Sequence, residues 1–80
     1  MWKKNMNRQE AAGVIERFLE GRSLYPQEWN DFVDTPQEDS VIETCRQQCY
    51  GLDPLLNRPG TPDSSALNDL KRALERLRSS

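Results

Sequence analysis

The amino-acid sequence predicts a small all-α protein, a four-helix array, and three features of the chain lead to that prediction. Apolar residues recur at intervals of three and four residues, which places them on one face of an α-helix. No segment alternates apolar and polar residues for long enough to suggest a strand. Glycine and proline divide the chain into pieces of helical length. Because a helix must bury its apolar face, we expect the helices to pack on one another.

The first helix is expected over residues 8–20. Asn7 and Glu10 have the spacing of a capping box, in which each side chain binds the backbone N–H of the other residue. Apolar residues follow at helical spacing: Ala11, Val14, Ile15, Phe18 and Leu19. Gly21 suits the left-handed backbone conformation that often follows a helix end. The preceding residues 1–6 show no pattern, so we expect a loose N-terminus.

A short second helix is expected over residues 26–34, because proline is favoured in the first helical turn and Pro26 lies there. Trp29 and Phe32 fall on one side of this helix, while Glu28 faces elsewhere. Two interpretations of the aromatic residues stay open. They either fill the core, which a chain of 80 residues needs, or form an exposed anchor for a partner.

A third helix is expected over residues 36–50. Thr35 is placed to cap it, with Pro36 in its first position and Glu38 completing a capping box. Its apolar positions are Val41, Ile42, Cys45 and Cys49. Gly51 follows them and is expected to end the helix.

The rest of the chain is expected to form a proline-rich loop at residues 52–61 and a fourth helix at residues 62–78. The last helix has the clearest amphipathic pattern, with leucines at heptad spacing: Leu67, Leu70, Leu74 and Leu77. This leucine stripe either packs inside the molecule or forms a seam with a second chain. Residues 1–80 are too few for a second core, so we expect a single helical domain.

Composition and charge narrow the classes of function. The formal net charge is −2, and residues 22–60 hold seven acidic residues against three arginines. A binder of duplex DNA gains affinity from a net basic face, so this balance argues against a nucleic-acid partner. No run of apolar residues is long enough for a secretory signal or a membrane span, so we expect a cytoplasmic protein without membrane contact.

No catalytic, cofactor-binding or metal-binding site can be assembled from the residue types present. The chain has no histidine, the usual general base at neutral pH. Cys45 and Cys49 lie four residues apart on a helix, where a disulfide bond would be strained, and a structural zinc site needs four ligands. A nucleophilic cysteine would need a helix N-terminus or a nearby cation, and only Arg46 adjoins them in sequence. We expect two reduced core thiols, no cofactor, no metal and no enzymatic activity.

The most distinctive charge feature is an acidic stretch: Asp31, Asp34, Glu38, Asp39 and Glu43. Three interpretations are open, namely a solvated face, a partner-binding face and a site for Mg²⁺ or Ca²⁺. The spacing of a calcium-binding EF-hand loop is absent, which argues against the metal site. For a partner protein with a basic surface, the candidate binding residues are Tyr25, Asp31, Asp34, Glu38 and Asp39.

The basic side of the last helix is the basis of an alternative hypothesis. It consists of Lys71, Arg72, Arg76 and Arg78, residues that can contact DNA or RNA. Asp69 and Glu75 interrupt it, at the spacing that pairs them with Arg72 and Arg78 across one helical turn. A nucleic-acid-associated regulator is therefore the alternative to a protein-interaction module.

Three short segments resemble a loose group of small uncharacterised bacterial helical proteins: Ile15-Glu16-Arg17-Phe18-Leu19-Glu20-Gly21, Trp29-Asn30-Asp31-Phe32 and Ile42-Glu43-Thr44-Cys45-Arg46. In that group a Phe-Leu-x-Gly helix end precedes a Trp-x-Asp-Phe segment, and the resemblance implies a bacterial origin without any known activity. In size, helix count and acidity the chain also looks like the immunity proteins that block bacterial nuclease toxins with an acidic helical face. That likeness implies a specific form of the interaction hypothesis, an immunity or antitoxin role.

Overall fold

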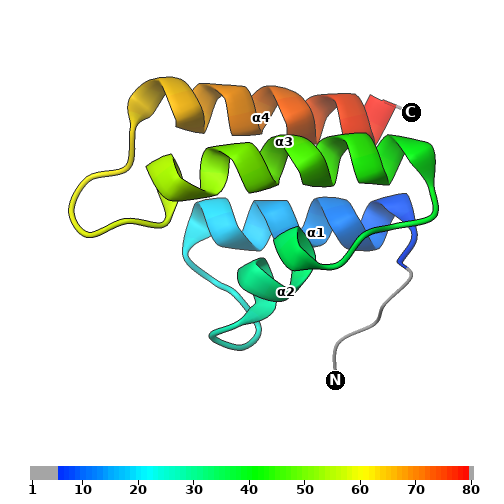
Figure 1. Cartoon of the computed structure of the whole chain (residues 1–80), viewed down its shortest axis with the longest axis horizontal. Helices are drawn as coiled ribbons and strands as arrows, with labels where there is room; N and C mark the ends of the chain where they lie inside the picture. The colour runs from blue at the N-terminus through cyan, green and yellow to red at the C-terminus, as the bar shows by residue number, and fades with distance from the viewer. Residues whose placement is uncertain (1–5, 80) are drawn as a thin grey trace.

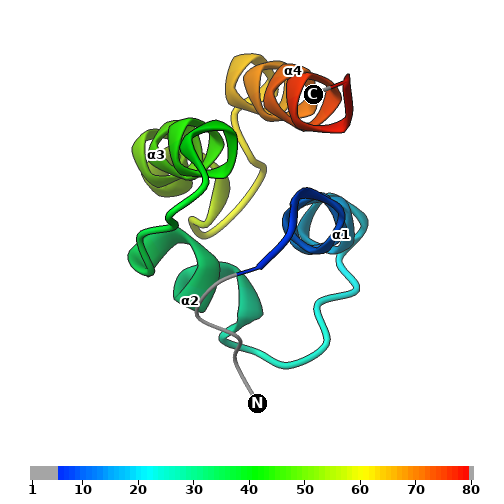
Figure 2. The same ribbon diagram turned by 90° about the vertical axis from the view of Figure 1, so that its right-hand side faces the viewer.

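The computed structural model describes residues 6–79, and these form four α-helices and no strand: α1 (Arg8–Glu20), α2 (Glu28–Asp34), α3 (Ser40–Leu56) and α4 (Ser64–Ser79). The predicted all-α class is confirmed. In Figure 1 the axes of α1, α3 and α4 are nearly parallel, and α4 runs in the opposite direction to the other two. Figure 2 shows the helices around a common centre, with α2 and α4 on opposite sides of it. None of the helices is long and apolar enough to cross a membrane within the described part of the chain.

α1 forms with the predicted bounds because both of its ends are closed by local hydrogen bonds. The Asn7 side chain accepts from the Glu10 backbone N–H at 2.7 Å, and the Glu10 side chain accepts from the Asn7 N–H at 2.9 Å. At the other end Gly21 adopts a left-handed conformation with a φ of 68°. A residue with a Cβ would be strained there, so the glycine defines the helix end.

The expectation of a loose N-terminus is wrong for Met6. Its backbone N–H donates to Gln37 Oε1 at 3.1 Å, and its side chain packs against the core. The other residues of that expectation, 1–5, lie outside the described part of the chain.

The core lies where the helices meet, and its largest fully buried side chains are Phe32, Ile15, Ile42, Leu70, Leu77 and Cys49. Trp29 is only 3% exposed, and its ring stacks on that of Phe18 with 3.9 Å between the centroids. The aromatic residues of α2 therefore fill the core and are not an exposed anchor. The leucine stripe of α4 also packs inside the molecule, although Leu67 is only partly buried.

α2 is shorter than the predicted span 26–34, because it begins at Glu28. Tyr25 lies in a turn before the helix, and the Glu28 N–H closes that turn by donating to the Tyr25 carbonyl at 3.1 Å. The Glu28 carboxylate is buried against Arg17 of α1. Pro26 therefore lies in the turn that precedes α2 and not in its first helical turn.

α3 begins at Ser40, and the predicted cap at Thr35 is wrong. The cap is Asp39, whose carboxylate accepts from the backbone N–H groups two and three residues further on, at 2.9 and 3.0 Å. The preceding residues form a connection that is held by tertiary contacts. Gln37 is buried in it with 7% exposure, and its backbone N–H donates to Glu43 Oε1 at 2.9 Å.

The end of α3 also differs from the predicted span 36–50, because the helix continues through Gly51 and Pro54 to Leu56. A proline inside a helix removes one hydrogen bond and crowds the preceding turn. The burial of Leu56, which is 4% exposed, helps to offset that cost. Gly51 has no positive φ, so it does not act as a helix stop.

The loop after α3 comprises residues 57–63 and not the predicted 52–61. Asp63 closes it by capping the last helix, since its carboxylate accepts from the Ala66 backbone N–H at 2.9 Å. This cap places the first residue of α4 at Ser64, slightly later than predicted.

Candidate interaction surface

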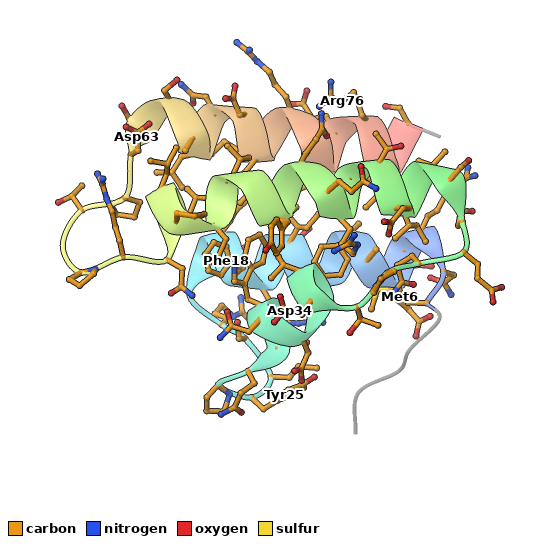
Figure 3. The ribbon with its side chains drawn as sticks, in the orientation of Figure 1. Met6, Phe18, Tyr25, Asp34, Asp63 and Arg76 are labelled. Atoms are coloured by element: carbon orange, nitrogen blue, oxygen red, sulfur yellow. The ribbon has the colours of Figure 1, made fainter. Side chains whose placement is uncertain are left out.

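The side of the molecule formed by α2 carries three of the predicted partner-binding residues. The Tyr25 hydroxyl donates to Asp31 Oδ2 at 3.1 Å. Partial burial and then this hydrogen bond raise the pKa of Tyr25 above its ordinary value. Asp34 follows Asp31 by one helical turn and is exposed. Figure 3 shows Tyr25 and Asp34 on the α2 side of the molecule, away from Arg76.

Glu38 and Asp39 lie in the connection between α2 and α3 and have different roles. Glu38 is exposed, and its carboxylate makes no hydrogen bond or ion pair with any of residues 6–79. Asp39 caps α3 and pairs with Arg8 Nη2 at 3.2 Å; the backbone hydrogen bonds and then Arg8 lower the pKa of Asp39. Asp39 therefore serves the fold. We call the exposed Asp34 and Glu38, together with the partly exposed Asp31, the acidic surface.

Glu43, the last residue of the acidic stretch, is also committed to the fold. Its two carboxylate oxygens accept from Arg46 Nε and Nη2, each at 2.7 Å. Arg46, followed by the backbone N–H of Gln37, lowers the pKa of Glu43 to about 2. Arg46 also donates to the Val33 carbonyl at 2.5 Å, so this ion pair connects α3 to α2.

On the α2 side the exposure of Leu24 was not predicted, and the expectation that Glu28 faces away from the buried aromatic side is wrong. Leu24 is 73% exposed, the highest value among the large hydrophobic residues of the described chain. Glu28 is only 3% exposed, and its carboxylate accepts from Arg17 Nε and Nη2 at 3.1 and 2.8 Å and from the Leu24 N–H at 3.1 Å. No local spacing could reveal this ion pair, because Arg17 lies 11 residues away on another helix.

A glycine in α1 gives the buried ion pair its space. A Cβ at Gly13 would lie 3.0 Å from Arg17 Nη1, so the guanidinium passes close over the backbone of α1. The Arg17–Glu28 pair and the loop at Leu24 are thus held by a close fit between α1 and α2.

The basic residues of α4 do not form one continuous face. Their contacts are Arg78 with Glu16 of α1, Arg76 with Gln48 of α3 at 3.0 Å, and Arg72 with Asp69 of α4 itself at 3.8 Å. The predicted pair of Asp69 with Arg72 forms, whereas Arg78 reaches across to α1 rather than to Glu75. Arg72 and Arg76 line the same groove between α3 and α4, whereas Arg78 is directed to α1. Because the cations are divided in this way, they offer a poor track for a phosphate backbone.

The two cysteines of the described chain are free, buried thiols. The hydrogen bond with Cys49, followed by the charge of Arg76, lowers the pKa of Cys45, whereas the hydrogen bond with Cys45 and burial raise the pKa of Cys49. Among residues 6–79 no group of three or more histidine, cysteine, aspartate or glutamate side chains could hold a metal ion. A groove of about 410 Å³ between α3 and α4 is lined by Gln47, Gln48, Gly51, Leu52, Asp69, Arg72 and Arg76, a set without a thiol or a hydroxyl.

The fold and this surface define a small all-α protein with exposed carboxylates on the side formed by its shortest helix. Comparisons with known proteins gave no match to a family model, to a curated protein or to a solved structure. Function is therefore inferred from the acidic surface itself.

Proposed function

We propose that the protein is a non-enzymatic, cytoplasmic interaction module whose acidic surface binds a partner protein with a basic surface. The observation that carries this proposal is the exposure of Asp34 and Glu38, with Asp31 partly exposed beside them, within a segment that has seven acidic residues and three arginines. Among the described residues, neither Asp34 nor Glu38 forms a hydrogen bond or an ion pair. The charge of Asp34 contributes to the raised pKa of Arg46 after the larger effect of Glu43, and both carboxylates remain exposed to cations of another molecule.

The acidic stretch contains two kinds of carboxylate, those bound within the fold and those exposed without such contacts, and this difference supports the proposal. Asp39 and Glu43 are used by the fold, as a helix cap and as the partner of Arg46. A carboxylate that has no such contact gains nothing for the fold by lying near other carboxylates, because like charges repel. Clustered charges of one sign do speed the encounter with a partner of the opposite sign and exclude wrong partners.

An immunity or antitoxin protein is the narrower form of this proposal. In that form the basic partner is a toxin enzyme, and the acidic surface covers it and blocks its activity. The size, the helical fold and the acidity of the chain support it. The general form requires only a basic partner, so it stands or falls separately from this one.

The proposal is tested by affinity capture of the tagged protein from a lysate of its source cells at low and at moderate salt. The wild type is compared with the triple variant Asp31→Asn, Asp34→Asn, Glu38→Gln, in which the amide oxygen introduced at position 31 can still accept from the Tyr25 hydroxyl. The matched control Glu20→Gln, Asp69→Asn, Glu75→Gln removes the same amount of charge outside the acidic surface. Circular dichroism shows whether each variant remains helical.

A basic protein that the wild type and the control retain, and that both lose as salt rises, is the expected result. The triple variant should retain at least about tenfold less of it, since weakened charge contacts reduce affinity. Equal retention by the triple variant and the wild type would refute the proposal. Purified partner and protein, measured by calorimetry, then give the affinity, and an assay of the partner shows whether its own activity is inhibited.

A further inference from the structure

The loop between α1 and α2 carries the most exposed large hydrophobic residue of the described chain, Leu24 at 73%. Exposed leucines are common on soluble proteins, so exposure alone has no functional meaning. Leu55 at the end of α3, for example, is 41% exposed. Leu24 differs from Leu55 in its place, because it lies in a loop whose next residue, Tyr25, is hydrogen-bonded to Asp31 of the acidic surface, whereas Leu55 lies within α3.

Three contacts fix this loop. At its start the Arg22 N–H donates to the Arg17 carbonyl at 2.8 Å, and at its end the Glu28 N–H donates to the Tyr25 carbonyl at 3.1 Å. In between, the Leu24 N–H donates to Glu28 Oε1 at 3.1 Å. The leucine side chain is therefore turned to solvent on a backbone that is bonded at its own residue.

The acceptor of the Leu24 N–H is a buried charge, which is an energetically costly way to hold a loop. Glu28 is 3% exposed and depends on the Arg17 guanidinium for its compensation. A buried ion pair commonly stabilises a protein no better than apolar residues of the same shape would. Its effect here is directional, since one carboxylate oxygen, Glu28 Oε1, accepts from both Arg17 Nε and the Leu24 N–H.

We infer that Leu24 is a preorganised apolar anchor beside the acidic surface, and that it inserts into a small apolar pocket rimmed by basic residues on the partner protein. This inference rests on the proposed function and specifies its partner. The acidic surface adjoins Leu24, because Tyr25, the next residue, is hydrogen-bonded to Asp31 of that surface. Its negative charge favours a partner whose pocket is rimmed by basic residues. A central apolar contact surrounded by polar contacts is the usual arrangement of a binding hot spot. Holding the anchor in place beforehand removes an ordering cost from binding.

Two defined peptides test the inference without a known partner, by ¹⁵N NMR titration of the full chain. One peptide alternates lysine with glycine, and the other alternates lysine with leucine at the same length and charge. Both should shift the amide signals of Asp31, Asp34 and Glu38. Only the lysine–leucine peptide should also shift residues 23–26. Leu24→Ser should weaken binding of that peptide by about tenfold and leave the lysine–glycine peptide unaffected, whereas the control Leu55→Ser should change neither.

The outcomes separate the two proposals. Shifts at the acidic surface with both peptides, without a response of residues 23–26 to the leucine peptide, would overturn the anchor and leave the proposed function standing. If neither peptide shifts the acidic surface, the proposed function fails and the anchor fails with it.

The preorganisation is tested separately by ¹H–¹⁵N heteronuclear NOE values. In the wild type, residues 22–26 should be as rigid as the helices, and a loop as mobile as a chain end would overturn the inference. The double variant Arg17→Met, Glu28→Met keeps the site filled with apolar atoms but removes the acceptor of the Leu24 N–H. This variant should remain helical by circular dichroism. It should show lower NOE values at residues 22–26 and bind the lysine–leucine peptide more weakly than the wild type does. Unchanged NOE values would contradict the role assigned to Glu28.

Discussion

α2 and α4 lie on opposite sides of the core and are held to it in different ways. α4 has 16 residues, and it buries a regular stripe: Ala66, Leu70, Ala73, Leu74 and Leu77. α2 has seven residues and buries only four, one of which is the carboxylate residue Glu28. A long amphipathic helix is oriented by its apolar stripe, whereas so short a helix cannot be.

Polar contacts of defined direction orient α2, which is too short to be oriented by an apolar stripe. Glu28 pairs with Arg17 of α1, the Trp29 indole N–H donates to Asp53 Oδ1 of α3 at 2.6 Å, and Arg46 of α3 donates to the Val33 carbonyl. The comparison teaches that the side proposed for binding is positioned by bonds of defined direction. The opposite side is positioned mainly by packing, and its charges lie at the surface.

The largest expected effect is on the packed side. Leu70→Ala removes a fully buried side chain of α4 and should lower the free energy of unfolding by about 3–4 kcal/mol, because it leaves a cavity in the core. Urea denaturation followed by circular dichroism measures the change. Arg72→Ala on the same helix, whose residue is exposed, should stay within about 0.5 kcal/mol of the wild type. Equal effects of the two variants would contradict the account of α4.

Removing one half of the buried ion pair should have the next largest effect. Arg17→Met leaves the Glu28 carboxylate buried without its cation and should cost about 2–3 kcal/mol, less than for a fully buried pair because the Arg17 side chain is 31% exposed. The double variant Arg17→Met, Glu28→Met should recover more than half of that loss. Denaturation curves of the two variants and the wild type check this, and additive losses would show that the two residues are not coupled.

Trp29→Phe should cost about 1–2 kcal/mol, because it removes the donor to Asp53 and leaves some space beside Phe18. Asp53→Asn keeps an acceptor for the indole and should cost less than half as much. Both values come from thermal unfolding. A larger loss in Asp53→Asn than in Trp29→Phe would mean that Asp53 acts through some other contact.

The smallest expected effect is the loss of stability at low pH that follows from protonation of Glu43. The pKa of Glu43 is lowered from 4.5 to about 2 by Arg46. Because the folded state holds the carboxylate ionised more strongly than the unfolded state does, its contribution is complete above about pH 5 and declines as the pH falls toward 2. The loss should be about 1–2 kcal/mol, since solvent partly screens the pair. Unfolding of Glu43→Gln at pH 7, 4 and 2.5 should show a shallower pH dependence than the wild type, and equal slopes would refute the assignment.

The structure confirms the local signals that bound α1, and it corrects the local signals at Pro26, Thr35 and Gly51. The bounds of α1 follow from Asn7, Glu10 and Gly21, whose hydrogen bonds and backbone conformation are local. The cap expected at Thr35 failed because Asp39 offered a cap that Arg8, 31 residues away, also binds. Patterns of a few residues cannot rank two plausible caps when a distant residue changes the balance.

The candidate site divides in the same way. Tyr25 and the acidic residues could be predicted as members of one region, because net charge and spacing are visible in the chain. The sequence could not tell that Asp39 is committed to the fold while Asp34 and Glu38 are accessible. Nor could it reveal the exposure of Leu24, which depends on the burial of Glu28 against another helix.

The all-α class, the approximate helices and the acidic middle of the chain are properties that the amino-acid order alone specifies. They arise from helical periodicity, from caps that close within three or four residues and from formal charge. The length of α3, the burial of Trp29 and the Arg17–Glu28 pair were decided in three dimensions. The physical reason is that burial and ion pairing depend on which distant groups meet. A helix continues through Gly51 and Pro54 when the contacts at its far end outweigh the local cost.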